Sequence, residues 1–282
     1  MENYLLAKRV LTGIIAIPLL VALIGWGSEN IFLIIVMLTA GLSLIEFYKI
    51  NLTSNEFGKA LAVTLGMLVV WFIYYFQGSL SSFKTNGMDG LIAWSIALIT
   101  LAVFMSLLLH LTLFPRNVIL VKKPLIAVLG IVYVCLFLSY LILIRSGTDG
   151  KSWVFFTLLL VWFSDTGAYA TGKIIGKNNL FPVISPNKTI EGYLGGLAAS
   201  LMPAFILKTF FLKDLPTIHC MLLALGIGVM GQLGDLCEST FKRANNLKNS
   251  GNLLPGHGGM LDRIDSLLFV APFVYYYKVL IL

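Results

Sequence analysis

Long apolar runs alternate with short polar segments along almost the whole chain. Runs of this length are long enough to cross the roughly 30 Å hydrocarbon layer of a bilayer as helices. They lie near residues 10–26, 31–48, 60–76, 91–113, 124–144, 152–170, 193–211, 218–236 and 266–281. Pro18 interrupts the first run, which lacks a small-residue cleavage site, so a retained helix is favoured over a signal peptide. The pattern predicts an all-α polytopic membrane protein with about nine transmembrane helices.

The composition agrees with this fold class. Hydrophobic residues make up 58% of the 282 positions and charged residues only 12%, which is too apolar for a soluble domain of this size. Cys135, Cys220 and Cys237 stand alone in or beside apolar runs. We interpret them as small apolar residues and expect neither disulfides nor metal ligation from them.

The distribution of charge predicts an orientation. With the N-terminus in the cytoplasm, nine spans put most of the 20 basic residues in cytoplasmic loops. Loops that face anionic lipid explain the net charge of +7, so we expect no nucleic-acid partner. The two longest hydrophilic loops, 171–192 and 237–265, then share the cytoplasmic side. We divide the chain into N-terminal transmembrane helices, 1–150, and a catalytic transmembrane region, 151–282, that carries both loops.

The densest polar chemistry lies between Ser239 and Asp265. Asp262 and Asp265 are three residues apart, so in a helical turn their carboxylates lie side by side. Asp235, at the end of the preceding apolar run, can join them, and such oxygen ligands favour Mg²⁺ bound to a nucleotide phosphate. The alternative for Asp262 and Asp265 is charge compensation at a helix N-terminus. Arg263 is suited to bind a phosphate through two donors.

Two further segments place polar groups at the ends of apolar runs. Asp165 lies on a helical stripe with Thr166, Tyr169 and Lys173. A carboxylate in a span usually faces the protein interior or a watery cavity. We therefore expect Asp165 either to ligate or orient substrate, or to pair with a buried cation. The second segment is the end of the run at 218–236, where a stripe on one helix face contains Gln232, Asp235, Glu238 or Ser239, and Lys242.

Glycines and lysines between residues 172 and 192 suggest phosphate binding, because glycine lets backbone amides approach and lysine supplies charge. The spacing does not match a Walker A loop. Ser185, Lys188 and Thr189 are the candidate contacts, and Thr189 also fits a helix N-cap. A plain basic loop is the alternative.

Two isolated residues have open roles. His257 lies between glycines, which favours a phosphate donor or an acid over a packed core histidine. Glu46, near the inner end of the second run, is either a ligand of a second site or an acid that reaches the headgroups.

The segment 239–265 resembles the C-terminal signature of the phosphatidate cytidylyltransferases, also called CDP-diacylglycerol synthases. The matching residues are Ser239, Phe241, Lys242, Arg243, Lys248, Gly251, Leu254, Pro255, His257, Gly258, Gly259, Met260, Asp262, Arg263, Ile264 and Asp265. The upstream segments S-D-T-G-A-Y, S-P-N-K-T-I-E-G and G-D-L-C-E-S are also similar to that family. Asn249 departs from the family pattern, which has Asp there, so a negative charge is missing at this position.

The resemblance implies a Mg²⁺-dependent nucleotidyltransferase of phospholipid biosynthesis. It would convert CTP and phosphatidic acid into CDP-diacylglycerol and pyrophosphate in the bacterial inner membrane, with the active site facing the cytoplasm. It implies catalytic roles for Asp235, Asp262, Asp265, Lys242 and Arg263, the three acids holding the metal. It implies substrate contacts for Asp165, Ser185, Lys188, Thr189, Glu238, Arg243, Lys248 and His257.

Two other functions compete with this one. Another CTP-dependent lipid enzyme, such as a dolichol kinase, shares the hydropathy but is not expected to carry the His-Gly-Gly signature. A transporter of an anionic solute would place its charges near the bilayer midplane, whereas here they collect at the ends of the runs. The sequence leaves open whether the chain forms a homodimer.

Overall fold

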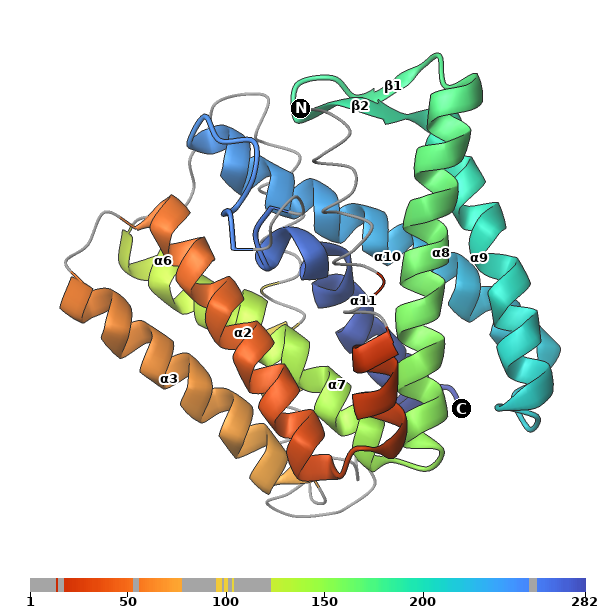
Figure 1. The fold of residues 1–282 in the computed structure, drawn as a ribbon, viewed down its shortest axis with the longest axis horizontal. Coiled ribbons are helices and arrows are strands. Elements are labelled where there is room, and N and C mark those ends of the chain that lie inside the picture. Colours follow the sequence, from red (N-terminus) through yellow and green to blue (C-terminus); the bar gives the residue numbers. More distant parts are fainter. Residues whose placement is uncertain are drawn as a thin grey trace.

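The computed structural model describes residues 14, 18–52, 56–77, 95–97, 99–100, 103, 123–253 and 258–282. The helical class predicted from the sequence is confirmed (Figure 1). The helices are α2 (Glu29–Asn51), α3 (Glu56–Tyr75), α6 (Lys123–Gly130), the π-helix η2 (Ile131–Leu136), α7 (Phe137–Ser146), α8 (Gly150–Ile175), α9 (Ile190–Phe210), α10 (Thr217–Ala244) and α11 (Leu261–Leu280). Two short strands that the sequence did not predict, β1 (Asn179–Phe181) and β2 (Ser185–Thr189), pair antiparallel between α8 and α9.

Six helices in the described part of the chain are long and apolar enough to cross a membrane: Glu29–Asn51, Glu56–Tyr75, Leu125–Ser146, Gly150–Ile175, Ile190–Phe210 and Thr217–Ala244. Each coincides with a predicted run. Helix α11 covers the last predicted run and carries four charged residues, Asp262, Arg263, Asp265 and Lys278, and it is not among these six. The predicted runs at 10–26 and 91–113 fall largely outside the described residues, and the total of nine spans stays a prediction.

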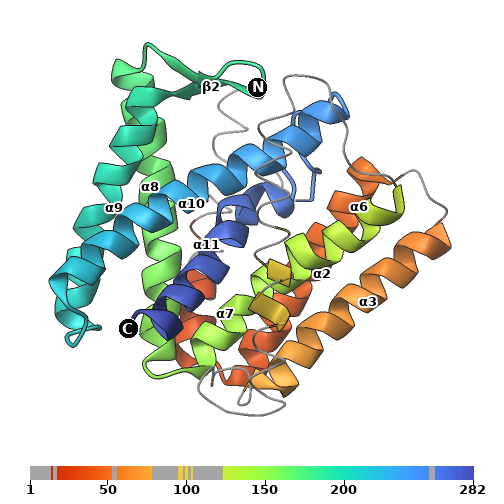
Figure 2. The ribbon, with the colours of Figure 1, turned by 180° about the vertical axis from the view of Figure 1, so that it is seen from behind.

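Helices α10 and α11 lie between the α8–α9 pair and the group formed by α2, α3, α6 and α7 (Figures 1 and 2). Helix α10 runs to Ala244, well beyond the end of the predicted span, so the acidic and basic stripe is helical throughout. The amide nitrogen Nδ2 of Asn245, just after α10, donates to Oδ1 of Asn51, just inside the end of α2, at 3.1 Å. The antiparallel pair of β1 and β2, which we call the hairpin, follows the end of α8 at the same end of the bundle (Figure 1). We therefore call this the hairpin end. The other end of α8–α11 is called the opposite end.

Close packing fixes the two helices that flank the hairpin. A Cβ atom at Gly167 of α8 would overlap Ala199 of α9, and one at Gly195 would overlap Thr171. The two helices therefore touch almost backbone to backbone, an approach that small residues permit in membrane helix pairs. This close contact fixes the two helices between which the hairpin lies.

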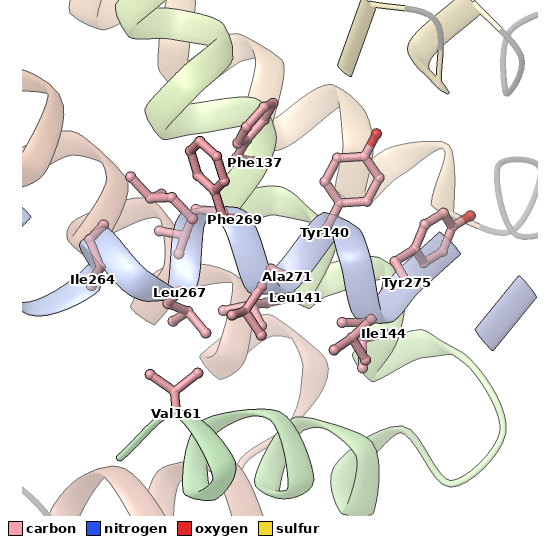
Figure 3. Packing of buried hydrophobic residues seen from close by; sticks show 14 of the residues in the cluster. Phe137, Tyr140, Leu141, Ile144, Val161, Ile264, Leu267, Phe269, Ala271 and Tyr275 are labelled. Atoms are coloured by element: carbon pink, nitrogen blue, oxygen red, sulfur yellow. The ribbon is translucent and has the colours of Figure 1, made fainter. Parts of the chain in front are cut away.

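Aromatic and aliphatic side chains surround α11. Phe269 packs edge-on against Phe137 of α7 with ring centroids 6.1 Å apart, and against Tyr133 of η2 at 6.3 Å. Figure 3 shows α11 with Phe137 and Tyr140 of α7 on one side and Val161 of α8 on the other. Phe269, Phe137 and Tyr133 are fully buried. Because α11 is embedded in this core, the polar residues of its first turns have fixed positions.

Candidate active site

Hydrogen bonds to residues at the start of α9 hold the hairpin in place. Oγ1 of Thr189 accepts from the amide of Gly192 at 3.1 Å, which makes Thr189 the N-cap of α9 and confirms the predicted cap. The carboxylate of Glu191 accepts from the backbone amides of Lys177 at 3.0 Å and Asn178 at 3.2 Å. These contacts fix β2 and therefore the direction of Lys188, the residue before the cap.

Lys188 joins the hairpin to α10. Its Nζ lies 2.6 Å from Oδ2 of Asp235. The other carboxylate oxygen of Asp235 accepts from the hydroxyl of Ser239, one turn later on the same helix, at 3.3 Å. The predicted stripe on α10 thus faces the hairpin, and Lys188 and Asp235, which are far apart in the sequence, form one pair.

A second lysine lies at the centre of a buried network. Nζ of Lys242 forms an ion pair with Glu238 on its own helix and another with Oδ1 of Asp262 on α11, at 2.8 Å. Glu238 is 1% exposed and Lys242 7%, so each charge depends on its partner. Oδ2 of Asp262 also accepts from the amides of Ser250 at 3.0 Å and Gly259 at 2.9 Å. Asp262 therefore anchors the segment before α11.

Four carboxylates gather where α8, α10 and α11 meet. Asp265 lies within electrostatic reach of Asp235, Glu238 and Asp165, and it is 9% exposed. Asp165 hydrogen-bonds with Ser266 of α11 and is itself exposed. Acids that stand this close together repel one another, and they favour a bound cation. We call Asp165, Asp235, Glu238 and Asp265 the acid cluster.

The acid cluster fits the chemistry of a hard divalent cation. Its donors are all carboxylate oxygens, and Oε1 of buried Glu238 has no hydrogen-bond partner within the described residues. Among those residues, no three or more His, Cys, Asp or Glu side chains form a ready-made metal-binding group. Mg²⁺ does not need such a cage, because it usually keeps several waters and binds through one or two carboxylates.

The remaining predicted site residues have different surroundings. Nε of Arg243 donates to the carbonyl of Ile184 at 3.1 Å, and Nη1 donates to that of Leu247 at 2.6 Å. Arg243 thus ties the hairpin to the segment after α10. Lys248 and Arg263 are exposed, and Arg263 lies within electrostatic reach of Asp165. Ser185 lies in β2, whereas His257 is outside the described residues.

Sequence reasoning left Glu46 open between a ligand of a second site and an acid that reaches the headgroups, and it gave no role to Ser250, the residue that the structure joins to Glu46. Oε2 of Glu46, on α2, accepts from Oγ of Ser250 at 3.0 Å and from the amide of Leu261 at 2.9 Å. The only signal in the sequence was a carboxylate inside an apolar run. Its partner could not be identified, because Ser250 follows 204 residues later.

Comparisons with known proteins agree over nearly the whole chain. The model of the cytidylyltransferase family matches residues 7–281. A phosphatidate cytidylyltransferase of Bacillus subtilis is 36% identical over 272 residues, which cover 95% of this chain and 96% of that protein. One of Staphylococcus haemolyticus is 34% identical over 264 residues, covering 94% and 95%. One of Staphylococcus aureus is 44% identical over 135 residues, covering 48% and 52%.

Proposed function

The chain belongs to the cytidylyltransferase family, and from this premise we propose that it transfers CMP from CTP to phosphatidic acid. The products are CDP-diacylglycerol and pyrophosphate. The relatives that match almost the full chain carry the name of this activity. The observation that carries the proposal is the meeting of Lys188, Asp235 and Asp265 from the hairpin, α10 and α11.

The reaction needs positioning and charge neutralisation more than a strong base. A phosphate oxygen of phosphatidic acid attacks the α-phosphorus of CTP, a new P–O bond forms, and the bond to the β-phosphate breaks. The nucleophile is already an anion, and both substrates are polyanions. Cationic side chains next to a carboxylate cluster are suited to hold such groups in line.

The proposed cofactor is Mg²⁺, which would neutralise the triphosphate and polarise the phosphorus–oxygen bonds when bound. Asp235 and Asp265 are its proposed ligands. The sequence suggested Asp262 as the third, but Asp262 already accepts from Lys242, Ser250 and Gly259. Asp165 is exposed and interacts with Asp235, so its contacts favour it over Asp262.

Lys188 and Arg263 are the proposed phosphate-binding cations at the acid cluster. Lys188 pairs with Asp235, and the exposed guanidinium of Arg263 can present two donors to one phosphate. Lys248, exposed in the segment before α11, and His257 are proposed to bind the outer phosphates. Arg243 and Thr189 are proposed to act indirectly, because their polar atoms hold the hairpin.

The chain is a membrane protein with bacterial relatives, and we propose that it lies in the inner membrane with the hairpin end in the cytoplasm. The bias of basic residues supports this orientation. Lys177→Cys and Asn252→Cys, both at exposed positions of the hairpin end, should react with an impermeant thiol reagent only from the cytoplasmic side. Lys213→Cys, at the opposite end, is the matched control and should react only from outside. The reverse pattern would contradict the orientation.

The function is tested with purified protein in detergent, CTP, phosphatidic acid and Mg²⁺. We expect equimolar pyrophosphate and CDP-lipid, with Asp265→Asn as the inactive control. A CTP-dependent lipid kinase would release CDP and a phosphorylated lipid instead, and a transporter would consume no CTP. Either of those results would rule out the proposed reaction.

A further inference from the structure

Helix α2 contributes one buried carboxylate to the hairpin end. Glu46 is 6% exposed, and burying a carboxylate is unfavourable unless hydrogen bonds compensate it. Both donors to its Oε2, the hydroxyl of Ser250 and the amide of Leu261, belong to the far end of the chain. The position of Glu46 and the position of that segment therefore depend on each other. We call the described residues between α10 and α11, 245–253 and 258–260, the connecting segment.

A continuous set of polar contacts leads from Glu46 to the stripe on α10. Ser250, which donates its hydroxyl to Glu46, donates its backbone amide to Asp262 at 3.0 Å. Asp262 in turn forms an ion pair with Lys242, and Lys242 forms another with Glu238 of the acid cluster. If the connecting segment moved at Glu46, these contacts would displace Asp262 and Lys242, and with them Glu238 of the acid cluster.

The connecting segment packs closely against the carboxylate of Glu46. A Cβ atom at Gly251 would lie 2.6 Å from Oε1 of Glu46, and one at Gly259 would overlap Oε2. One residue further along α2, the ring of Phe47 packs against Phe241 of α10 with centroids 5.2 Å apart. The last turns of α2 are therefore fitted to both sides of the connecting segment.

We propose that Glu46 is a positioning residue of the active site: it holds the connecting segment so that Asp262 and Lys242 keep their places beside the acid cluster. The proposal rests on the proposed function for its kinetic part. Glu46 works as a hydrogen-bond acceptor in this role. It acts through Ser250 and Leu261 and does not touch the substrates.

Two replacements of Glu46 separate this role from ligation or charge. Glu46→Ala removes the acceptor, whereas Glu46→Gln keeps one carbonyl oxygen where Oε2 accepts both bonds. We expect Glu46→Ala to lower kcat by about 10- to 100-fold, since small displacements of catalytic groups have effects of this size. The KM for CTP should change less, because the misplaced groups act on the transition state. Glu46→Gln should restore most of the lost turnover.

The matched control is Ser43→Ala, one turn earlier on α2. Ser43 is fully buried, and its hydroxyl has no hydrogen-bond partner within the described residues. We expect normal kcat from it. Ser250→Ala removes one of the two bonds to Glu46 and should give a smaller loss than Glu46→Ala. The double variant should lose less than the sum of the single effects in free energy, because both changes break the same contact.

Hydrogen exchange supplies a readout that does not require turnover. In Glu46→Ala the amide protons of Ser250, Gly259 and Leu261 should exchange faster, and in Ser43→Ala they should not. If the wild-type protein makes no CDP-lipid, the proposed function fails while this measurement still tests the positioning role.

Two results would overturn the proposal. One is normal kcat and normal exchange in Glu46→Ala. The other is equal loss in Glu46→Gln and Glu46→Ala, which would show that the negative charge itself is needed. If Glu46→Ala does not fold, Ser250→Ala provides the test instead. A Ser250→Ala protein that is stable and fully active would then contradict the positioning role.

Discussion

The two ends of helices α8–α11 both carry charged side chains, but their partners differ. At the hairpin end, lysines pair with carboxylates from other elements: Lys188 with Asp235, and Lys242 with Asp262. At the opposite end, Lys278 donates to the backbone carbonyl of Thr148 at 2.6 Å and Lys151 to that of Gly25 at 2.8 Å.

A cation that binds a backbone carbonyl compensates the partial negative charge of that carbonyl at the end of a helix or turn. Such contacts bring no group of like charges together. Carboxylates that gather beside one another repel, so such a grouping marks a candidate functional site. The opposite end even has a cavity of about 720 Å³, lined by Asp149, Trp153, His219 and Lys278 among others. The comparison shows that the grouping of acids, more than the number of charges or the size of a cavity, identifies the candidate active site.

The largest difference between the two ends should appear when an acid becomes an amide. Asp235→Asn and Asp265→Asn should each lower kcat by about 10³-fold or more, because loss of metal-assisted charge stabilisation is worth several kcal/mol. Turnover across a Mg²⁺ titration measures this effect. Asp149→Asn at the opposite end is the matched control; Asp149 has φ 53°, a conformation that Asn tolerates. Near-normal turnover in both site variants would place the metal elsewhere.

Stability should differ as well when a lysine is removed from each end. Lys242→Met leaves Glu238 and Asp262 without their shared cation, and breaking such a buried pair costs about 3–5 kcal/mol. Lys278→Met removes a hydrogen bond to a carbonyl and a cation–π contact with Trp153, worth about 1–2 kcal/mol together. Thermal unfolding in detergent compares the two. Equal losses would mean that the network around Lys242 is no stronger than a simple cap.

A change of shape at constant charge gives a smaller effect. Arg263→Lys should reduce kcat/KM by about tenfold, because lysine cannot offer two oriented donors to a phosphate. Arg145→Lys at the opposite end should leave turnover normal, since Arg145 donates to the carbonyl of Gly27 at 3.3 Å. Steady-state kinetics on both variants tests this pair. Full activity of Arg263→Lys would exclude a bidentate contact.

The smallest effect concerns the position where this chain departs from its family. Asn249 is exposed and is not a member of the acid cluster. Asn249→Asp should therefore leave the Mg²⁺ dependence of turnover nearly unchanged. A marked gain in Mg²⁺ affinity would reveal position 249 as a ligand and this chain's site as a weakened form.

Local rules made much of this predictable. The apolar runs identified the six apolar helices, the Thr189 cap followed from its position before Glu191, and the spacing of Asp235, Ser239 and Lys242 placed them on one face of α10. The hairpin was missed, because strands of three and five residues leave little trace in a hydropathy pattern.

Contacts between distant elements could not be read in the same way. The pattern placed Asp262 beside Asp265 as a metal ligand, yet the choice of partners for Asp262 depends on how the connecting segment folds back. The pairing of Glu46 with Ser250 likewise depends on the packing of α2 against α10, which no local spacing encodes.

The bond between Glu46 and Leu261 also sets an order of events during synthesis. The two residues are 215 positions apart, and ribosomes add about 5–20 residues per second. Helix α2 thus exists for roughly 10–40 s before its partner is made. Through that interval the carboxylate of Glu46 lacks both of its native donors, Ser250 and Leu261. The hairpin end is completed only when α11 is translated, so a ribosome that stalls before residue 261 leaves a chain without the complete candidate active site.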